Sequence, residues 1–223
     1  MFAAVIVAAD KGTRMGQDKL FLEVNGLPVV GHTWHRFDLH PDISQTILVI
    51  RDELRGAYEE LANRLELTKP YLLTRGGSER QHSVGNGLSV IPPEIEWVAI
   101  QDAARPCTTN QTITETLNAA RESGAAVAAS KIVDTLKLAD GNHCISRNVD
   151  RTHLWAVQTP QAFRLKTIRQ AMDAVRDQNA SVTDDTAACE LIGQPVRMVE
   201  SDALNPKVTT RADLPLVELL LRQ

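Results

Sequence analysis

The sequence of 223 residues has no excess of positive charge. Its 24 lysines and arginines stand against 28 aspartates and glutamates, which gives a formal net charge of −4. Such a chain presents no global basic field that would attract nucleic acid or an anionic membrane. We therefore expect neither nucleic acid nor a membrane among its partners.

Cysteine is scarce, with three widely spaced residues, Cys107, Cys144 and Cys189. An odd and dispersed set argues against a disulfide framework or a zinc site and favours a reducing compartment, so we expect a cytoplasmic protein. No apolar run approaches the roughly 20 residues that span a bilayer. The apolar start, Met1 to Ala9, lacks a basic segment and leads directly into a charged loop. It therefore indicates a buried strand rather than a signal peptide.

The chain does contain apolar runs that alternate with segments of helical periodicity, over a length typical of one domain. The runs that predict strands lie at 2–9, 46–50, 70–74, 97–100, 125–130 and 196–200. The helical stripes lie at 30–37, 54–65, 84–91, 113–120, 168–175 and 214–221, with a further helix at about 184–192. This alternation predicts an α/β fold with a mostly parallel, Rossmann-like sheet and helices on both faces.

Residues 131–160 interrupt the alternation, because they have neither helical periodicity nor a long apolar run. A turn at Asp140-Gly141-Asn142 separates two polar segments, which predicts a hairpin that protrudes from the main sheet as a β-arm. No internal repeat or linker marks a second domain. We therefore expect one domain over residues 1–223, with the arm at about 131–160.

The loop after the first strand carries three cations, Lys11, Arg14 and Lys19, and two glycines, Gly12 and Gly16. Ligands of parallel α/β sheets bind beyond the carboxyl ends of the strands, and glycines let a ligand approach the backbone closely. The loop therefore suggests a polyphosphate cradle, although it matches neither the ATPase nor the dinucleotide fingerprint. A solvated surface loop with scattered charges is the alternative.

Two later loops also follow predicted strands. Gly76 and Gly77 precede a helix start for which Ser78 is the expected N-cap, and their amides with Ser83 could line a base or ribose pocket. A glycine turn with a cap is the plainer interpretation. Asp102 suits a magnesium ion or a substrate hydroxyl, and Arg105 suits a phosphate. The alternative there is a surface Asp–Arg pair.

Taken together, the chain resembles the 2-C-methyl-D-erythritol 4-phosphate cytidylyltransferases from Ala3 to about Leu220. The matching segments, in order, are Ala8-Ala9, Gly12-x-Arg14-Met15-Gly16, Lys19, Gly76-Gly77-x-x-Arg80, Asp102-Ala103-Ala104-Arg105-Pro106, Asp134-Thr135-x-Lys137, Val149-Asp150-Arg151, Thr159-Pro160-Gln161, Thr183-Asp184-Asp185 and Lys207-Val208-Thr209. The resemblance implies a nucleotide-diphospho-sugar transferase-like fold, and it implies CTP and a polyol phosphate as substrates with Mg²⁺ as cofactor. It places the reaction in non-mevalonate isoprenoid precursor synthesis.

The resemblance also implies roles for individual residues. The implied catalytic residues are Arg14 and Lys19, which would stabilise the five-coordinate transition state, and Arg151 and Lys207, which would position the acceptor phosphate. The implied substrate-binding residues are Ala8, Ala9, Gly12, Gly77, Arg80, Ser83, Asp102, Arg105 and Thr135, with Asp102 also the expected metal ligand. In the family the arm crosses to a partner subunit, so we expect a homodimer in which Thr135 and Arg151 act in the partner's site.

The chain departs from the family pattern at three positions. Asp10 replaces the usual glycine after the two alanines, Asp18 replaces the proline before Lys19, and Gln101 stands where histidine is common. A carboxylate near a triphosphate is unfavourable unless a cation such as Lys11 offsets it. Two alternatives stay open: a cytidylyltransferase for another polyol phosphate such as ribitol 5-phosphate, and a non-catalytic nucleotide-binding homologue.

Overall fold

The computed structural model describes residues 1–10, 18–201 and 203–222, and its main sheet has seven strands within these ranges. In spatial order the strands are β11 (Arg197–Glu200), β7 (Ala125–Lys131), β10 (Trp155–Arg164), β6 (Trp97–Asp102), β1 (Phe2–Val7), β4 (Ile43–Ile50) and β5 (Tyr71–Arg75). Every neighbouring pair is parallel except those of β10, which runs antiparallel to β6 and β7. The predicted mostly parallel sheet is thus confirmed.

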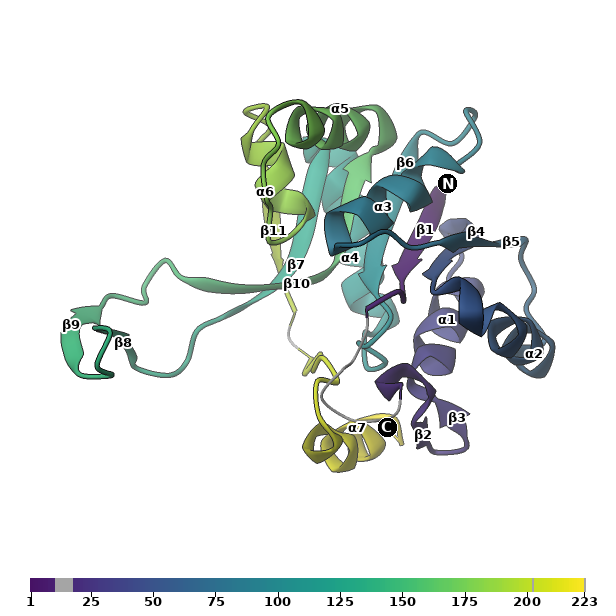
Figure 1. Cartoon of the computed structure of the whole chain (residues 1–223), viewed down its shortest axis with the longest axis horizontal. Helices are drawn as coiled ribbons and strands as arrows, with labels where there is room; N and C mark the ends of the chain where they lie inside the picture. The colour runs from purple at the N-terminus through teal and green to yellow at the C-terminus, as the bar shows by residue number, and fades with distance from the viewer. Residues whose placement is uncertain (11–17, 202, 223) are drawn as a thin grey trace.

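Helices cover both faces of the sheet, as the sequence predicted (Figure 1). The helices are α1 (Val29–Leu39), α2 (Arg55–Leu65), α3 (Arg80–Ser89), α4 (Asn110–Ser123), α5 (Leu165–Asp177), α6 (Asp185–Glu190) and α7 (Leu214–Leu220). Short 3₁₀ helices η1 (Lys19–Phe21), η2 (Asp52–Leu54) and η3 (Arg211–Asp213) and the two-stranded pair β2 (Glu23–Val24) and β3 (Leu27–Pro28) complete the body. Buried side chains of α1, α2, α4 and α7 join one apolar cluster, and those of α3, α5 and α6 join the other.

The alternation of side chains along β1 explains why the two apolar clusters lie on opposite faces of the sheet. Phe2, Ala4 and Ile6 point into one cluster, whereas Ala3 and Val5 point into the other, and all five are fully buried. Side chains alternate across a strand, so a run that is apolar at every position is stable only where both faces are covered. The uniform start of the sequence therefore forms a central strand of the sheet.

A hairpin lies in the segment where the sequence predicted a β-arm. Among the described residues, strands β8 (Leu136–Ala139) and β9 (Ile145–Val149) pair only with each other, and the hairpin stands away from the body in Figure 1. Of residues 131–160, however, Lys131 belongs to β7 and 155–160 belong to β10 in the main sheet. The segment between these two strands of the main sheet, which contains the hairpin, is therefore 132–154.

Strand β10, which the sequence analysis did not predict, contains a proline. Pro160 lies near the middle of a strand with a neighbour on each side, although a proline ordinarily argues against a central position. The pairing with β7 is irregular between Val157 and Gln161, which is where Pro160 stands. The missing backbone donor therefore coincides with a break in the ladder and costs the sheet no regular hydrogen bond.

Candidate active site

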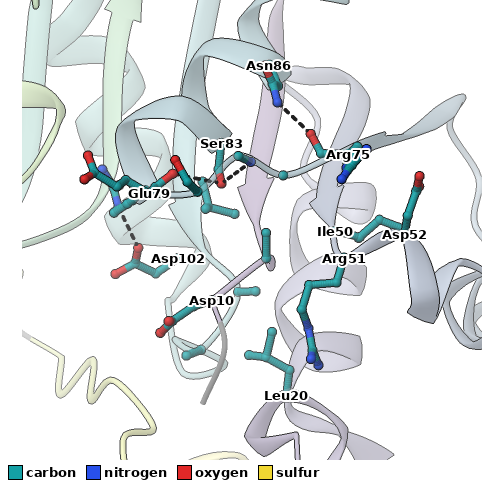
Figure 2. A pocket seen from close by; sticks show the side chains of 18 of the residues that line it. Asp10, Leu20, Ile50, Arg51, Asp52, Arg75, Glu79, Ser83, Asn86 and Asp102 are labelled. Atoms are coloured by element: carbon teal, nitrogen blue, oxygen red, sulfur yellow. Dashed lines mark hydrogen bonds and ion pairs between the residues drawn. The ribbon is translucent and has the colours of Figure 1, made fainter. Parts of the chain in front are cut away.

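A cleft of about 890 Å³ opens at the carboxyl ends of β1, β4, β5 and β6. Among the residues that line it are seven predicted from the sequence: Ala9, Lys19, Gly77, Arg80, Ser83, Asp102 and Lys207. Figure 2 shows the side chains of Asp10 and Asp102 on one side of this cleft and those of Arg51 and Arg75 on the other. Segments far apart in the chain thus meet where a parallel sheet is expected to bind its ligand.

Glycines and small residues shape the floor of the cleft between β1 and α3. A Cβ atom on Gly76 would lie 2.2 Å from the Cβ of Ala9, and one on Gly77 would lie 2.3 Å from the Cβ of His82. The Gly76 amide donates to the carbonyl oxygen of Ile50 at 2.8 Å, which joins the loop to the end of β4. Only glycine therefore fits this close approach of two backbones.

Ser83 holds the glycine loop to the first turn of α3. Its Oγ accepts a hydrogen bond from the Gly77 amide at 3.0 Å and donates to the Glu79 carbonyl at 3.1 Å. The expectation that Ser78 caps α3 was wrong, because Glu79 is the N-cap residue and the helix has no side-chain cap. The Ser78 hydroxyl instead lies 3.0 Å from Nδ1 of His82.

A cluster of cations surrounds the carboxylate of Asp102 at the end of β6. Oδ2 lies 2.9 Å from Nζ of Lys207 and 3.5 Å from Nε of Arg105, and Oδ1 lies 3.5 Å from Nε of Arg80. Burial would raise the pKa of Asp102, but Lys207 and Arg80, followed by Arg105, hold it below its ordinary value. The residue is only 8% exposed, so the alternative of a surface Asp–Arg pair is excluded.

The loop that carries Lys207 is fixed by Asn205, a residue for which the sequence analysis proposed no role. The buried Asn205 side chain donates to the carbonyl oxygen of Thr159 at 2.9 Å and accepts from Thr108 Oγ1 at 3.0 Å. The backbone carbonyl oxygen of Asn205 accepts a hydrogen bond from Nη1 of Arg105 at 2.7 Å. The Thr159 hydroxyl in turn accepts from the Asp102 amide at 3.0 Å, so one network orients both Asp102 and the Lys207 loop.

The two aspartates that depart from the family pattern each pair with a cation. Asp10 Oδ2 lies 3.2 Å from Nζ of Lys19, whose side chain is buried, whereas the Asp10 side chain is largely exposed. Asp18 caps η1 by accepting from the Leu20 amide at 3.0 Å, and its second oxygen pairs with Arg51. The described partner of Asp10 is Lys19, and Lys11, the cation expected from the sequence, lies outside the described residues.

Comparisons with known proteins agree with this architecture. Residues 2–223 match the family model for 2-C-methyl-D-erythritol 4-phosphate cytidylyltransferase. A relative of that name from Geobacillus kaustophilus is 41% identical over 222 residues, which cover 99% of this chain and 96% of the relative. A second, from Caldanaerobacter subterraneus, is 38% identical over 99% of both chains. The chain belongs to this family.

Solved structures of cytidylyltransferases have the same fold. The crystal structure of 4-diphosphocytidyl-2C-methyl-D-erythritol synthase from Anaerococcus prevotii aligns with a TM-score of 0.88 at 27% identity and covers 100% of this chain and 98% of that one. The 2-C-methyl-D-erythritol 4-phosphate cytidylyltransferase from Thermus thermophilus aligns with a TM-score of 0.81 at 28% identity over 100% of both chains. The nucleotidyltransferase fold expected from the sequence is therefore confirmed.

The remaining predicted site residues that the structure describes lie in three different places. Ala8 is fully buried behind the cleft in the apolar core, and Arg105 contacts Asp102 from beside the cleft. Thr135 and Arg151 are exposed on the two limbs of the hairpin and are not among the described residues that line the cleft. Gly12 and Arg14 lie outside the described residues, so their predicted roles stay predictions.

The cleft is compatible with a magnesium ion that enters together with a nucleotide. Within the ranges that the structure describes, no three His, Cys, Asp or Glu side chains come together as a metal cage. Mg²⁺ in nucleotide enzymes is commonly held by one or two carboxylates and by the phosphates of the substrate. Asp102 supplies one such carboxylate, and its cationic neighbours suit the phosphates.

The described helices include none that is long and apolar enough to cross a membrane.

Proposed function

We propose that this chain transfers the cytidylyl group of CTP to 2-C-methyl-D-erythritol 4-phosphate, which yields 4-diphosphocytidyl-2-C-methyl-D-erythritol and pyrophosphate. The observation that carries the proposal is the Asp102 cluster, in which Lys207, Arg80 and Arg105 converge at the end of β6 beside the glycine loop. Family membership over residues 2–223 supports the same assignment. The product would enter non-mevalonate isoprenoid precursor synthesis.

The reaction needs positioning and charge neutralisation rather than a protein nucleophile. An oxygen of the acceptor phosphate forms a bond to the α-phosphorus of CTP, and the bond from that phosphorus to the bridging oxygen of pyrophosphate breaks. Lys19, buried at the edge of the cleft, would face the negative charge that develops on the α-phosphate. Arg14 would share this role.

The acceptor would bind at the Asp102 side of the cleft. Lys207 is 37% exposed at its side chain and is held by the Asn205 loop, so its charge is available to a phosphate. Asp102, beside Arg105 and Arg80, would accept a hydrogen bond from a hydroxyl of the acceptor or would bind the magnesium ion. Magnesium, when bound, neutralises the triphosphate charge and so favours departure of pyrophosphate.

The nucleoside would bind on the glycine side. Ala9, Gly77 and Ser83 line the cleft there, and Gly76 lies too close to Ala9 to carry a side chain. We infer that this small-residue side of the cleft takes a pyrimidine rather than a purine. CTP is accordingly the proposed nucleotide.

The hairpin would complete the active site of a second copy in a homodimer. Val133, Leu138 and Ile145 are 79%, 46% and 69% exposed on a hairpin whose edges pair with no other strand of the described chain. Unpaired edges and exposed apolar side chains are liabilities that a two-fold interface removes. In such a dimer Thr135 and Arg151 would reach the cleft of the partner subunit.

Turnover tests the proposal directly. Purified protein with CTP, Mg²⁺ and 2-C-methyl-D-erythritol 4-phosphate should release pyrophosphate, measured with a coupled phosphate assay. Replacing the acceptor by ribitol 5-phosphate should reduce kcat/KM strongly. Equal turnover of the two acceptors would reassign the substrate, and no turnover with either would favour a non-catalytic nucleotide-binding homologue.

A further inference from the structure

Asp185 lies outside the set of residues lining the cleft, yet it contacts one of them. It is the first residue of α6 and is 1% exposed. Its Oδ2 accepts a hydrogen bond from Nη2 of Arg80 at 2.8 Å, and the sequence separates the two residues by 105 positions. Arg80 lines the cleft and turns its Nε toward Oδ1 of Asp102 at 3.5 Å. One guanidinium group thus connects a buried carboxylate with the carboxylate of the active site.

The two distances indicate which carboxylate holds Arg80 more strongly. A separation of 2.8 Å is typical of a charge-assisted hydrogen bond, whereas 3.5 Å is an ion pair with a weak hydrogen bond at most. The pKa of Arg80 lies above its ordinary value because Asp185, and then Asp102, outweigh the effect of burial. The guanidinium group of Arg80 is therefore bound more closely by Asp185 than by Asp102.

A second group anchors α6, so Asp185 is not needed for that purpose. Asp184 accepts from the amide of Ala187 at 3.0 Å and so caps the helix, and it also accepts from Nε2 of Gln161 in β10 at 3.0 Å. The helix would keep both its cap and its link to the sheet if Asp185 lost its charge. What Asp185 adds to the described structure is the closer of the two counter-charges of Arg80.

We propose that Asp185 is a positioning residue that acts through Arg80 to keep the carboxylate of Asp102 free for substrate. The inference rests on the proposed function of Asp102. If Asp185 were neutral, the half-buried Arg80 would keep Asp102 as its remaining carboxylate partner in the cluster. Arg80 would then draw closer to Asp102, which would become less available to the acceptor hydroxyl or to magnesium.

A double-mutant cycle tests this coupling. Asp185→Asn should raise the KM for 2-C-methyl-D-erythritol 4-phosphate by about tenfold in the wild-type background, a size usual for coupled neighbours, with a smaller change in kcat. The same substitution in the Arg80→Gln background should change that KM less than about threefold, because no guanidinium group remains to be redirected. Calorimetric titration of the enzyme with the acceptor should show the same dependence on background.

Asp184→Ala is the matched control. It removes the cap of α6 and the contact with Gln161 but leaves the Asp185–Arg80 pair intact. It should lower the melting temperature while the KM for the acceptor changes less than about threefold, since a lost cap acts on the helix alone. An equal loss in Asp184→Ala, or an effect of Asp185→Asn that is the same in both backgrounds, would overturn the proposal and leave Asp185 as a structural residue.

Folding of the variants provides a second measurement. Should Asp185→Asn not fold, the double variant Asp185→Asn/Arg80→Gln should fold, because removing both charges of a buried pair costs less than removing one. A double variant that fails to fold as well would overturn the coupling. Absence of turnover in the wild-type protein would count against the proposed function instead, so the two failures are distinguishable.

Discussion

Nζ of Lys19 lies 3.2 Å from Oδ2 of Asp10, so the cation expected at the transferred phosphate is paired with a carboxylate where the family usually has glycine. The Lys19 side chain is 9% exposed and that of Asp10 is 69% exposed. The pair therefore places a fixed cation behind a carboxylate that faces solvent and the entering nucleotide. Two predictions follow from the different positions of its members.

Asp10→Asn should lower the KM for CTP. The carboxylate of Asp10 competes with the triphosphate for Lys19, and it also repels the triphosphate. Asparagine keeps the size of the side chain while removing the charge. Because the pair is exposed on one side, the expected change is about two- to fivefold in initial-rate measurements at low ionic strength. The change in KM should become smaller as salt is added.

Glu23→Gln, an equal change of charge in the exposed pair with Arg64, is the control and should leave the KM unaltered. A raised KM for Asp10→Asn would instead indicate that Asp10 helps to bind the nucleotide or its metal ion.

Lys19→Ala should act mainly on kcat. A cation that meets charge developing in the transition state lowers the barrier more than it stabilises the bound substrate, so we expect kcat to fall by about 10² or more. Steady-state kinetics with CTP varied at saturating acceptor measures the effect. Lys166→Ala, which removes an exposed lysine on α5, serves as the control. Intact turnover with only a raised KM would show that Lys19 is a plain binding residue.

The sequence predicted the scaffold well because its signals are local. The apolar run of β1, the helical stripes and the turn between β8 and β9 each depend on neighbouring residues, and each was recovered. Strand β10 was missed because residues 131–160 contain no long apolar run. Its Pro160 stands where the pairing with β7 is irregular, which explains how a central strand accommodates a proline. Local pattern could not reveal that irregularity, which depends on the position of a strand elsewhere in the chain.

For the same reason, the sequence predicted individual residues of the site but not the contacts between them. Asp102 and Lys207 could be named because both stand near the ends of predicted strands or in segments that resemble the family. Their 2.9 Å contact, however, joins residues 105 positions apart. The pairing of Arg80 with Asp185 and the support that Asn205 gives to the Lys207 loop are contacts of the folded chain. No spacing within the sequence indicates them.

Gly76→Ala should damage both stability and nucleotide binding. The added Cβ would lie 2.2 Å from the Cβ of Ala9, and neither atom belongs to a flexible side chain, so the loop must shift away from β1. Overpacking of this kind costs about 1–3 kcal/mol, and the shift should raise the KM for CTP.

Gly85→Ala is the matched control, because nothing lies within 4 Å of its added Cβ in α3. That variant should gain about 0.5–1 kcal/mol, since alanine is the better helix former. Chemical denaturation and initial rates measure both, and two variants that behaved alike would show that the close approach to Ala9 is unimportant.

Mixed dimers should reveal whether the active site is shared between subunits. Lys207 contacts Asp102 in the cleft, whereas Arg151 is exposed on the hairpin limb. If Arg151 reaches the partner's cleft, Arg151→Ala and Lys207→Ala homodimers should each be nearly inactive. Co-refolding the two variants produces heterodimers with one site that bears both lesions and one site that bears none. Random mixing makes about half of all dimers mixed, so about a quarter of wild-type activity should return, by two-fold symmetry alone. Native mass spectrometry verifies that heterodimers form. If the mixture stays as inactive as its parents while heterodimers are present, Arg151 acts within its own chain and the hairpin does not complete the partner's site.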